Sequence, residues 1–345
     1  MCHRKRGRVK PRTKWGKGIA VAESRHEDNR VDTSLGLRSL LGHTAAGEPL
    51  SLNRAPCEEI SPWVARVYAT QVEAEPDHVF ECGLCADTPI LRVLFKGEWT
   101  ATTRYGTGRY NPAALFFGPQ TRRMPVTVKG GFATVGVALK PGAVTALKGP
   151  SVADTLDRII YYDDIYGDHE WGTSDQMLQW FDPAGPPERW LRVAELLFAQ
   201  LAERAGEAKP DPIVAAFDKA AFADPNMNIG EFAAEHAVER RRLERLIKKA
   251  YGQTPKQVLR RARALDIAAN LRGVADDAEA EELALRYYDQ SHMIREFTAF
   301  FGMTPKQFVK RPQPLLTLTL EARQARRLEV LGRHDPADRY PWRRE

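Results

Sequence analysis

The chain has 345 residues, of which 43% are hydrophobic and 28% charged, a composition typical of a soluble protein with about two domains. No apolar run approaches the ~18 residues that a membrane-spanning helix requires, which excludes that class of protein and favours a cytoplasmic one. The net charge is +6, but residues 1–17 contain eight Lys or Arg and no acidic residue, so the rest sums to −2. The overall basicity is therefore weak evidence for a polyanionic partner.

Residues 1–60 are expected to be a basic, disordered extension. The apolar stretch that follows the basic start is about five residues long, shorter than the roughly 7–15 residues of a signal-peptide core. Residues 61–205 are predicted to form a domain that is first β-rich and then helical. Short apolar runs within residues 90–139, separated by Gly, Pro and Asn, indicate strands, whereas Trp190, Val193 and Leu197 recur at helical spacing.

Two of the four cysteines form a C-x-x-C pair, Cys82–Cys85. A redox pair requires a helix N-terminus after the first cysteine, but a β-like run follows here. A zinc site would need two further ligands, and His78 and Cys57 are nearby without a recognised spacing. The cysteines are therefore expected to be structural, and no metal or cofactor is predicted. A metal or redox protein that uses the Cys82–Cys85 pair is kept as an alternative hypothesis.

Residues 209–314, beyond a polar linker at residues 206–212, are predicted to be all helical. The pattern G-x-T-P-K-Q occurs at residues 252–257 and again at residues 302–307. Glycine suits the left-handed residue just past a helix end, threonine can cap the next helix, and proline fits its first turn. Each copy therefore predicts a helix, a tight turn and a second helix. Residues 315–345 are expected to be a basic tail with one basic helix near its start.

The helix before each tight turn has one apolar stripe and one polar face. Leu243, Ile247 and Tyr251 form the stripe in the first copy, and Met293, Phe297 and Phe301 form it in the second. In the first copy, a short helix at residues 229–236 and a turn near Ala237 precede the striped helix, which completes a helix-turn-helix pattern. The polar faces are sized to enter a major groove, where Arg can meet guanine and Gln can meet adenine. Their candidate DNA-binding residues are Arg240, Arg241, Glu244, Arg245, Lys248, Gln290, Ser291, His292 and Arg295.

A long helix expected at residues 256–271 joins the two copies. Such a rigid connection can hold two recognition helices about one DNA turn, ~34 Å, apart. The charged face alone would also fit an ordinary solvated surface. The recurrence of the same face fifty residues later favours DNA binding.

Residues 285–308 resemble the C-terminal helix-turn-helix of AraC/XylS-type transcription regulators, and residues 232–259 resemble their first one. The resemblance covers about residues 210–311. It implies an α+β multidomain chain in which a double helix-turn-helix domain with a linker helix follows a cupin-like or otherwise β-rich domain. It also implies contacts to DNA bases or backbone from Arg241, Glu244, Arg245, Gln290, Ser291, His292 and Arg295. Glu239 stands where the first motif usually has a small hydroxyl residue; it would complement the helix dipole and repel phosphate.

The partners that follow are double-stranded promoter or operator DNA, a small-molecule effector of the β-rich half, RNA polymerase and a second copy of the chain. Phe117, Phe132, Arg122, Arg123 and Asp164 are candidates to line an effector pocket, although ordinary packing or surface positions are favoured for each.

A regulator of this kind is not an enzyme, and no catalytic residue is predicted. An alternative hypothesis is an interaction protein whose helix-turn-helix units have drifted from DNA to protein binding. Residues 226–311 hold 16 Lys or Arg against 12 Asp or Glu, a net charge of +4. That balance is compatible with DNA binding without requiring it.

Overall fold

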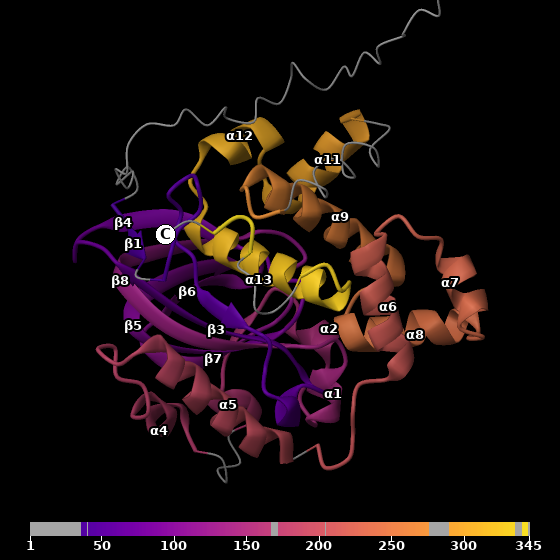
Figure 1. Ribbon diagram of the computed structural model, residues 1–345, viewed down its shortest axis with the longest axis horizontal. Coiled ribbons are helices and arrows are strands. Elements are labelled where there is room, and N and C mark those ends of the chain that lie inside the picture. Colours follow the sequence, from indigo (N-terminus) through magenta and orange to yellow (C-terminus); the bar gives the residue numbers. More distant parts are fainter. Residues whose placement is uncertain are drawn as a thin grey trace, which may run out of the picture.

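The computed structural model describes residues 36–39, 41–166, 172–203, 205–275, 290–334 and 340–343. Within them, the N-terminal half forms one curved nine-stranded sheet, and the C-terminal half is helical (Figure 1). The strands are β1 (Arg38–Ser39), β2 (Leu52–Arg54), β3 (Val64–Glu73), β4 (Val79–Leu84), β5 (Ile90–Thr103), β6 (Gly106–Tyr110), β7 (Ala113–Phe117), β8 (Met124–Leu139) and β9 (Ile159–Tyr161). The predicted α+β chain, with a β-rich half before a helical half, is confirmed.

All of the strand pairs are antiparallel, and the long strand β8 lies at the centre of the sheet. β8 pairs with β5 on one side and, on the other, with β4 along its first half and β3 along its second. Register shifts between β5 and β8 near Lys96 bend the two strands. Because alternate side chains point to opposite faces, Val67 belongs to the apolar cluster on one face and Tyr68 to the cluster on the other.

Short helices and one long helix cover the first of these faces. They are the 3-10 helix η2 (Glu58–Ile60) and the α-helices α1 (Ala143–Ala146), α2 (Val152–Thr155), α3 (Asp163–Tyr166), α4 (Ser174–Leu178) and α5 (Pro187–Glu203). Trp190 of α5 is 1% exposed and packs edge-on against Phe95 of β5, with ring centroids 4.8 Å apart. The helix expected around Trp190 is therefore α5, in which Trp190 is part of the buried stripe and Val193 and Leu197 are partly buried at its edge.

Residues 36–60 differ from the predicted disordered extension. β1 and β2 pair with β3, and Leu50 and Ile60 are 0% and 1% exposed. Glu48 is 1% exposed and accepts a hydrogen bond from Arg272, which lies in the helical half. The sequence misled here because the order of this segment depends on tertiary contacts, some of them, such as that of Glu48 with Arg272, more than two hundred residues away. Residues 1–35 lie outside the described part of the chain.

The helical half comprises α6 (Pro212–Ala223), α7 (Ile229–Glu235), α8 (Arg240–Tyr251), α9 (Pro255–Leu271), α11 (Gln290–Phe301), α12 (Pro305–Lys310) and α13 (Pro314–Val330). Both predicted turns are confirmed. Gly252 and Gly302 each have φ +68°, the left-handed conformation that glycine adopts freely. Thr254 caps α9 and Thr304 caps α12. In each case the threonine hydroxyl accepts from the backbone N–H of the glutamine three residues later, and the glutamine side chain accepts from the threonine N–H.

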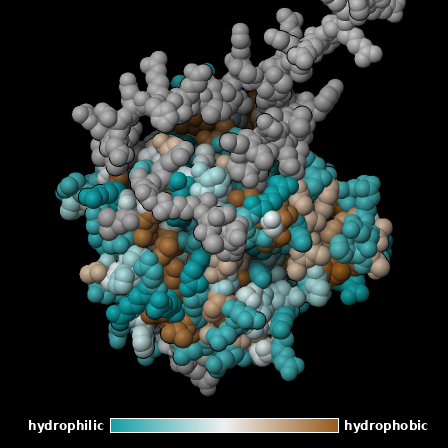
Figure 2. Space-filling view, viewed as in Figure 1, coloured by the Kyte–Doolittle hydropathy of each residue, from teal (hydrophilic) through white to brown (hydrophobic). Residues whose placement is uncertain are grey.

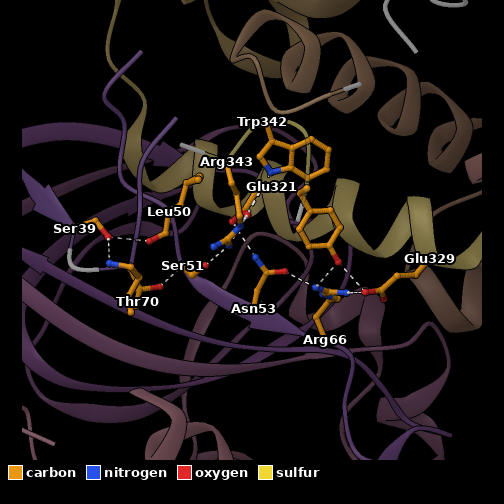
Figure 3. A network of polar contacts seen from close by, with 12 residues as sticks. Ser39, Leu50, Ser51, Asn53, Arg66, Thr70, Glu321, Glu329, Trp342 and Arg343 are labelled. Atoms are coloured by element: carbon orange, nitrogen blue, oxygen red, sulfur yellow. Dashed lines mark hydrogen bonds and ion pairs between the residues drawn. The ribbon is translucent and has the colours of Figure 1, made fainter. Parts of the chain in front are cut away.

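The helix expected in the basic tail is α13, but it is buried rather than exposed. It lies between the sheet and α9 (Figure 1). Leu315 and Leu318 pack on the face of the sheet that α5 leaves open, while Leu316 and Leu320 pack with the second helix-turn-helix unit. Polar contacts fix it as well: Figure 3 shows Glu321 of α13 near Asn53 of β2 and near Arg343. The C-terminal helix therefore joins the two halves. No helix in the described part of the chain has the length and apolarity to cross a bilayer.

Candidate nucleic-acid interface and cavity

The first helix-turn-helix unit is built from α7, a tight turn and α8. Asn228 caps α7 by accepting hydrogen bonds from the backbone N–H groups of the next turn. Ala237 has φ +49°, so the expected turn is a left-handed one at a non-glycine residue. Leu243 and Ile247 are both 0% exposed, and their burial fixes which face of α8 points outward.

All five candidate DNA-binding residues of α8 are exposed: Arg240, Arg241, Glu244, Arg245 and Lys248. Arg240 pairs with Glu244 one helical turn away at 3.3 Å, a surface pair of small energetic value. Arg241, Arg245 and Lys248 make no hydrogen bond or ion pair with the described residues, so their charges are available to a partner. Their spacing places them along one face of the helix.

Glu239 is the N-cap residue of α8. Its backbone has the extended conformation of a cap (φ −60°, ψ 134°), but its side chain makes no capping hydrogen bond. The first N–H groups of α8 are therefore left without a side-chain acceptor. The carboxylate nevertheless complements the positive end of the helix dipole.

α11 presents the corresponding face of the second unit. Ser291, His292 and Arg295 are exposed, and Gln290 is the first residue of the helix. Met293, Phe297 and Phe301 are 7% or less exposed, as the apolar stripe predicts. The first helix expected in this unit, together with residues 276–289, lies outside the described residues. Ile294 is 41% exposed on the same face, where an apolar side chain could contact a thymine methyl group.

α9 connects the two units and contributes to both of their cores. Val258 and Leu259 pack with the residues of α7 and α8, whereas Leu265 and Ala268 pack with those of α11 and α12. Glu296 of α11 accepts a hydrogen bond from Arg260 of α9 at 2.9 Å. In Figure 1, α8 and α11 lie at opposite ends of α9.

The C-terminal ends of α8 and α11 contact the N-terminal half. A Cβ on Gly252, just after α8, would lie 3.0 Å from the backbone of Ala153 in α2. The carbonyl of Phe300, near the end of α11, accepts a hydrogen bond from the backbone N–H of Arg123 at 2.6 Å. The sheet domain is thus in contact with both recognition helices.

A cavity lies between the sheet and α13. Tyr68, Arg92, Trp99 and Phe132 line it from the strands, and Leu318 and Arg326 line it from α13. Of the residues expected around a pocket, Phe132 lines this cavity, and the ring of Phe117 lies 4.6 Å from the Arg92 guanidinium. Arg122 and Arg123 line a separate polar cleft with Arg104. Asp164 is on α3 and lines neither.

The geometry of the C-x-x-C pair does not support a redox site. Cys82 packs in the cluster between the sheet and α13, whereas Cys85 packs with the helices of the second unit. Burial raises the pKa of Cys82 to about 11 and that of Cys85 to about 12, so both thiols are protonated at neutral pH. The described part of the chain holds no cluster of three metal-binding side chains.

Residues 232–311 match a family model described as "Helix-turn-helix domain". No curated protein sequence matches the chain. Among solved structures, the chain is similar to apo ToxT from Vibrio cholerae, with 9% identity and a TM-score of 0.40 over 71% of this chain and 97% of that one. ToxT bound to an unsaturated fatty acid gives 10% identity and 0.40 over 72% and 95%. The AraC-like transcriptional activator CuxR gives 12% identity and 0.27 over 63% and 86%.

Proposed function

We propose that this protein, whose residues 232–311 match a helix-turn-helix family model, is a sequence-specific transcription regulator of the AraC type that responds to a small molecule. The observation that carries the proposal is the repeated unit: two helices with exposed polar faces share one rigid connecting helix. The proposal assigns no chemical reaction to the chain. It places the protein in the cytoplasm with its DNA partner.

In this proposal α8 and α11 enter two successive faces of the major groove, about one DNA turn apart. Arg245 and Arg295 stand at the same position of the two copies and are both exposed, which suits each to a bidentate contact with guanine. Arg240, Arg241, Glu244 and Lys248 act with the first helix, and Gln290, Ser291 and His292 act with the second. The free cations of α8 also supply a phosphate-binding contribution that weakens as salt rises.

The cavity between the sheet and α13 supports the small-molecule part of the proposal. Like most small-molecule sites, it is largely apolar and has a few polar side chains. One of its walls is α13, which also packs against α9 of the DNA-binding half. A molecule bound there would touch both halves at once.

The test is a selection of genomic DNA fragments by the full-length chain at two salt concentrations. We expect an enriched motif with two half-sites about one helical turn apart. The double variant Arg245→Ala/Arg295→Ala should lose the motif, and Arg192→Ala, which removes an exposed arginine of α5, should keep it.

The protein-interaction hypothesis makes the opposite prediction. It rests on the weak positive charge of residues 226–311, which hold 16 basic and 12 acidic residues. Recovery of DNA without a motif, or of no DNA at either salt concentration, would reject sequence-specific binding and favour this hypothesis.

A further inference from the structure

Arg92 is a buried cation that has no carboxylate partner among the described residues. It lies on β5, is 6% exposed, and lines the cavity beneath α13. Its Nε donates to the hydroxyl oxygen of Tyr68 at 2.9 Å, while Nη1 has no hydrogen-bond partner in the described chain. Burying a charge away from water is costly, so buried charges are normally paired. Arg92 therefore has unused capacity to bind an anion.

The other cationic residues of the cavity are already neutralised. Arg66 pairs with Glu329 at 2.6 Å, Arg323 pairs with Asp87 at 2.9 Å, and Arg326 pairs with Asp218. Asp87 is the one acidic residue among the described residues that line the cavity, and Arg323 occupies it. Arg92 is therefore the arginine of the cavity that has no carboxylate partner among the described residues.

Three aromatic rings hold Arg92 in place. Its guanidinium lies 5.5 Å from the ring centre of Tyr68, 5.2 Å from that of Trp99 and 4.6 Å from that of Phe117. These contacts offset part of the cost of burial and restrict the side chain to one orientation. Nη1 is buried and makes no hydrogen bond within the described chain, so it keeps its donor capacity for a ligand.

Further donors stand beside it. Trp99 is 2% exposed, lines the cavity, and its Nε1–H has no partner in the described chain. The hydroxyl of Tyr68 accepts from Arg92, and burial raises the pKa of that phenol, so it stays protonated and keeps a proton to donate. An arginine and two neutral donors without an acceptor match a carboxylate.

The other residues that line the cavity determine which kind of ligand body fits beside Arg92. Leu84, Ile90, Phe132, Leu315 and Leu318 contribute apolar walls. On the face seen in Figure 2, apolar residues lie in small groups among hydrophilic ones, in contrast to the adjoining apolar walls of the cavity. An anion that fills it must bury an apolar body next to its charge.

We propose that the cavity binds a small organic monocarboxylate with a compact apolar body, and that Arg92, Trp99 and Tyr68 hold its carboxylate. This names the ligand class of the small-molecule response in the proposed function and rests on that proposal only for its regulatory meaning. Binding itself does not require DNA. It can therefore be tested on the full-length chain alone.

The probes are benzoate, 3-phenylpropanoate and octanoate, each compared with its neutral amide. Thermal unfolding and calorimetric titration report binding, since a ligand of the folded state raises the melting temperature with concentration. We expect at least one acid to bind and its amide to bind at least tenfold more weakly. If no acid binds, or if the amides bind equally well, the ligand class is wrong.

Arg92→Met keeps the length of the side chain and removes the charge. We expect the acid to bind at least tenfold more weakly, while the melting temperature of the ligand-free protein is unchanged or higher. Arg158→Met is the control, because Arg158 is an exposed arginine that also stacks on a ring, 3.8 Å from the centre of Tyr105. Undiminished binding by Arg92→Met would overturn the proposal.

A second variant covers the case in which Arg92→Met does not fold. Leu318→Trp fills the cavity from α13 and should abolish acid binding without changing any charge. Acid binding that survives Leu318→Trp would place the ligand elsewhere and overturn the proposal. If acids fail to bind while the chain still selects a DNA motif, the proposed ligand class is wrong and the proposed regulator function is still supported. Acid binding without selection of a DNA motif would support the ligand class and reject the sequence-specific regulator.

Discussion

Arg245 and Arg295 are the two residues on which the DNA-binding proposal can be tested most directly. They occupy the same place in the two copies of the repeat, and both are exposed while their helices are held by buried apolar stripes. We expect Arg245→Ala and Arg295→Ala each to lower affinity for the selected DNA several-fold or more, since a bidentate contact with guanine contributes roughly 1–3 kcal/mol.

Fluorescence anisotropy with the selected DNA measures this loss, and thermal unfolding checks the fold. Neither melting temperature should fall, because neither arginine is part of the core. Unchanged DNA affinity in both variants would reject the assignment of α8 and α11 to the major groove. Arg192→Ala on α5 is the matched control.

Glu239 is expected to oppose DNA binding in the same unit. Its side chain does not cap α8, and its negative charge stands at the helix end nearest to the expected phosphates. We expect Glu239→Ser to raise the free energy of unfolding by roughly 1 kcal/mol, because serine can cap the helix. Affinity for DNA should rise as well.

Glu231→Ser is the control for Glu239→Ser, because it removes an exposed charge from α7 without creating a cap. Urea unfolding and anisotropy measure the two effects. A Glu239→Ser protein with lower DNA affinity would mean that the carboxylate takes part in recognition.

Gly136 is required by the arrangement around Arg92. It lies opposite Tyr68 on one neighbouring strand and opposite Arg92 on the other. A Cβ at this position would lie 2.1 Å from the hydroxyl oxygen of Tyr68, so the phenol can reach Arg92 only across a glycine. We expect Gly136→Ala to cost about 1–3 kcal/mol of stability by overpacking and to weaken acid binding.

Urea unfolding and calorimetry measure both of these effects. Gly230→Ala is the control: a Cβ there meets only the Asn228 side chain at 3.2 Å, and alanine favours the helix interior. Normal stability and normal acid binding in Gly136→Ala would show that Tyr68 can move without consequence.

At the scale of single elements, the sequence predicts what is local. The two G-x-T-P-K-Q copies carry their own geometry, with a left-handed glycine and a threonine cap, so the turns and the outward faces of α8 and α11 follow from spacing alone. The position of α13, in contrast, does not follow from the spacing of its own residues. Arg323, Arg326 and Arg327 suggest an exposed basic face, and their burial depends on partners elsewhere in the chain.

The cavity escapes sequence analysis for the same reason. Tyr68 and Arg92 meet only because β3 and β5 flank β8 in one particular register. The alternation within each strand predicts the face of a side chain but not its neighbour on the next strand. Sequence analysis therefore identified Phe132 as a candidate but did not identify Arg92, which lines the same cavity.

Asp87 shows how α13 is held to the sheet domain. It follows β4, and its carboxylate accepts a hydrogen bond from Arg323 of α13 at 2.9 Å; the same arginine also bonds Asp266 of α9 at 2.5 Å. Burial acts to raise the pKa of Asp87, but Arg323, Arg261 and Arg326 outweigh it and lower that pKa below its ordinary value. The folded state therefore favours the charged carboxylate.

We expect Asp87→Asn to destabilise the protein by up to roughly 3–5 kcal/mol at pH 7, the cost of breaking a buried pair. A lowered folded-state pKa gives a contribution that is complete above the unfolded value, about 3.9, and lost as pH falls through the lower folded value. The gap between wild type and Asp87→Asn should thus shrink below about pH 4. Urea unfolding across pH 3–7 tests this. Asp77→Asn is the control, because the Asp77 side chain is 97% exposed. Its free energy of unfolding should equal that of the wild type at each pH.

At the scale of the whole molecule, the cavity is connected to a recognition helix by two polar contacts. Arg326 lines the cavity and pairs with Asp218 of α6. Asp218 accepts a hydrogen bond from the hydroxyl of Tyr251, the last residue of α8, at 2.8 Å. A ligand that moves α13 would therefore change the support of α8, and the same contact would report DNA binding back to the cavity.

Tyr251→Phe removes one contact of this connection and leaves both sites intact. We expect the acid and the DNA each to bind nearly as in the wild type, because the lost hydrogen bond is worth only about 0.5–1.5 kcal/mol. The change in DNA affinity caused by saturating acid should be smaller than in the wild type. Anisotropy titrations with and without the acid measure this coupling.

Tyr340→Phe is the matched control, since its hydroxyl donates to Glu329 of α13 at 2.8 Å but does not reach α6 or α8. It should keep the full effect of the acid on DNA affinity. An equal loss in both variants would mean that α13 acts through its general stability rather than through Asp218. Full coupling in Tyr251→Phe would move the connection to the contacts of α13 with α9, where Arg323 meets Asp266.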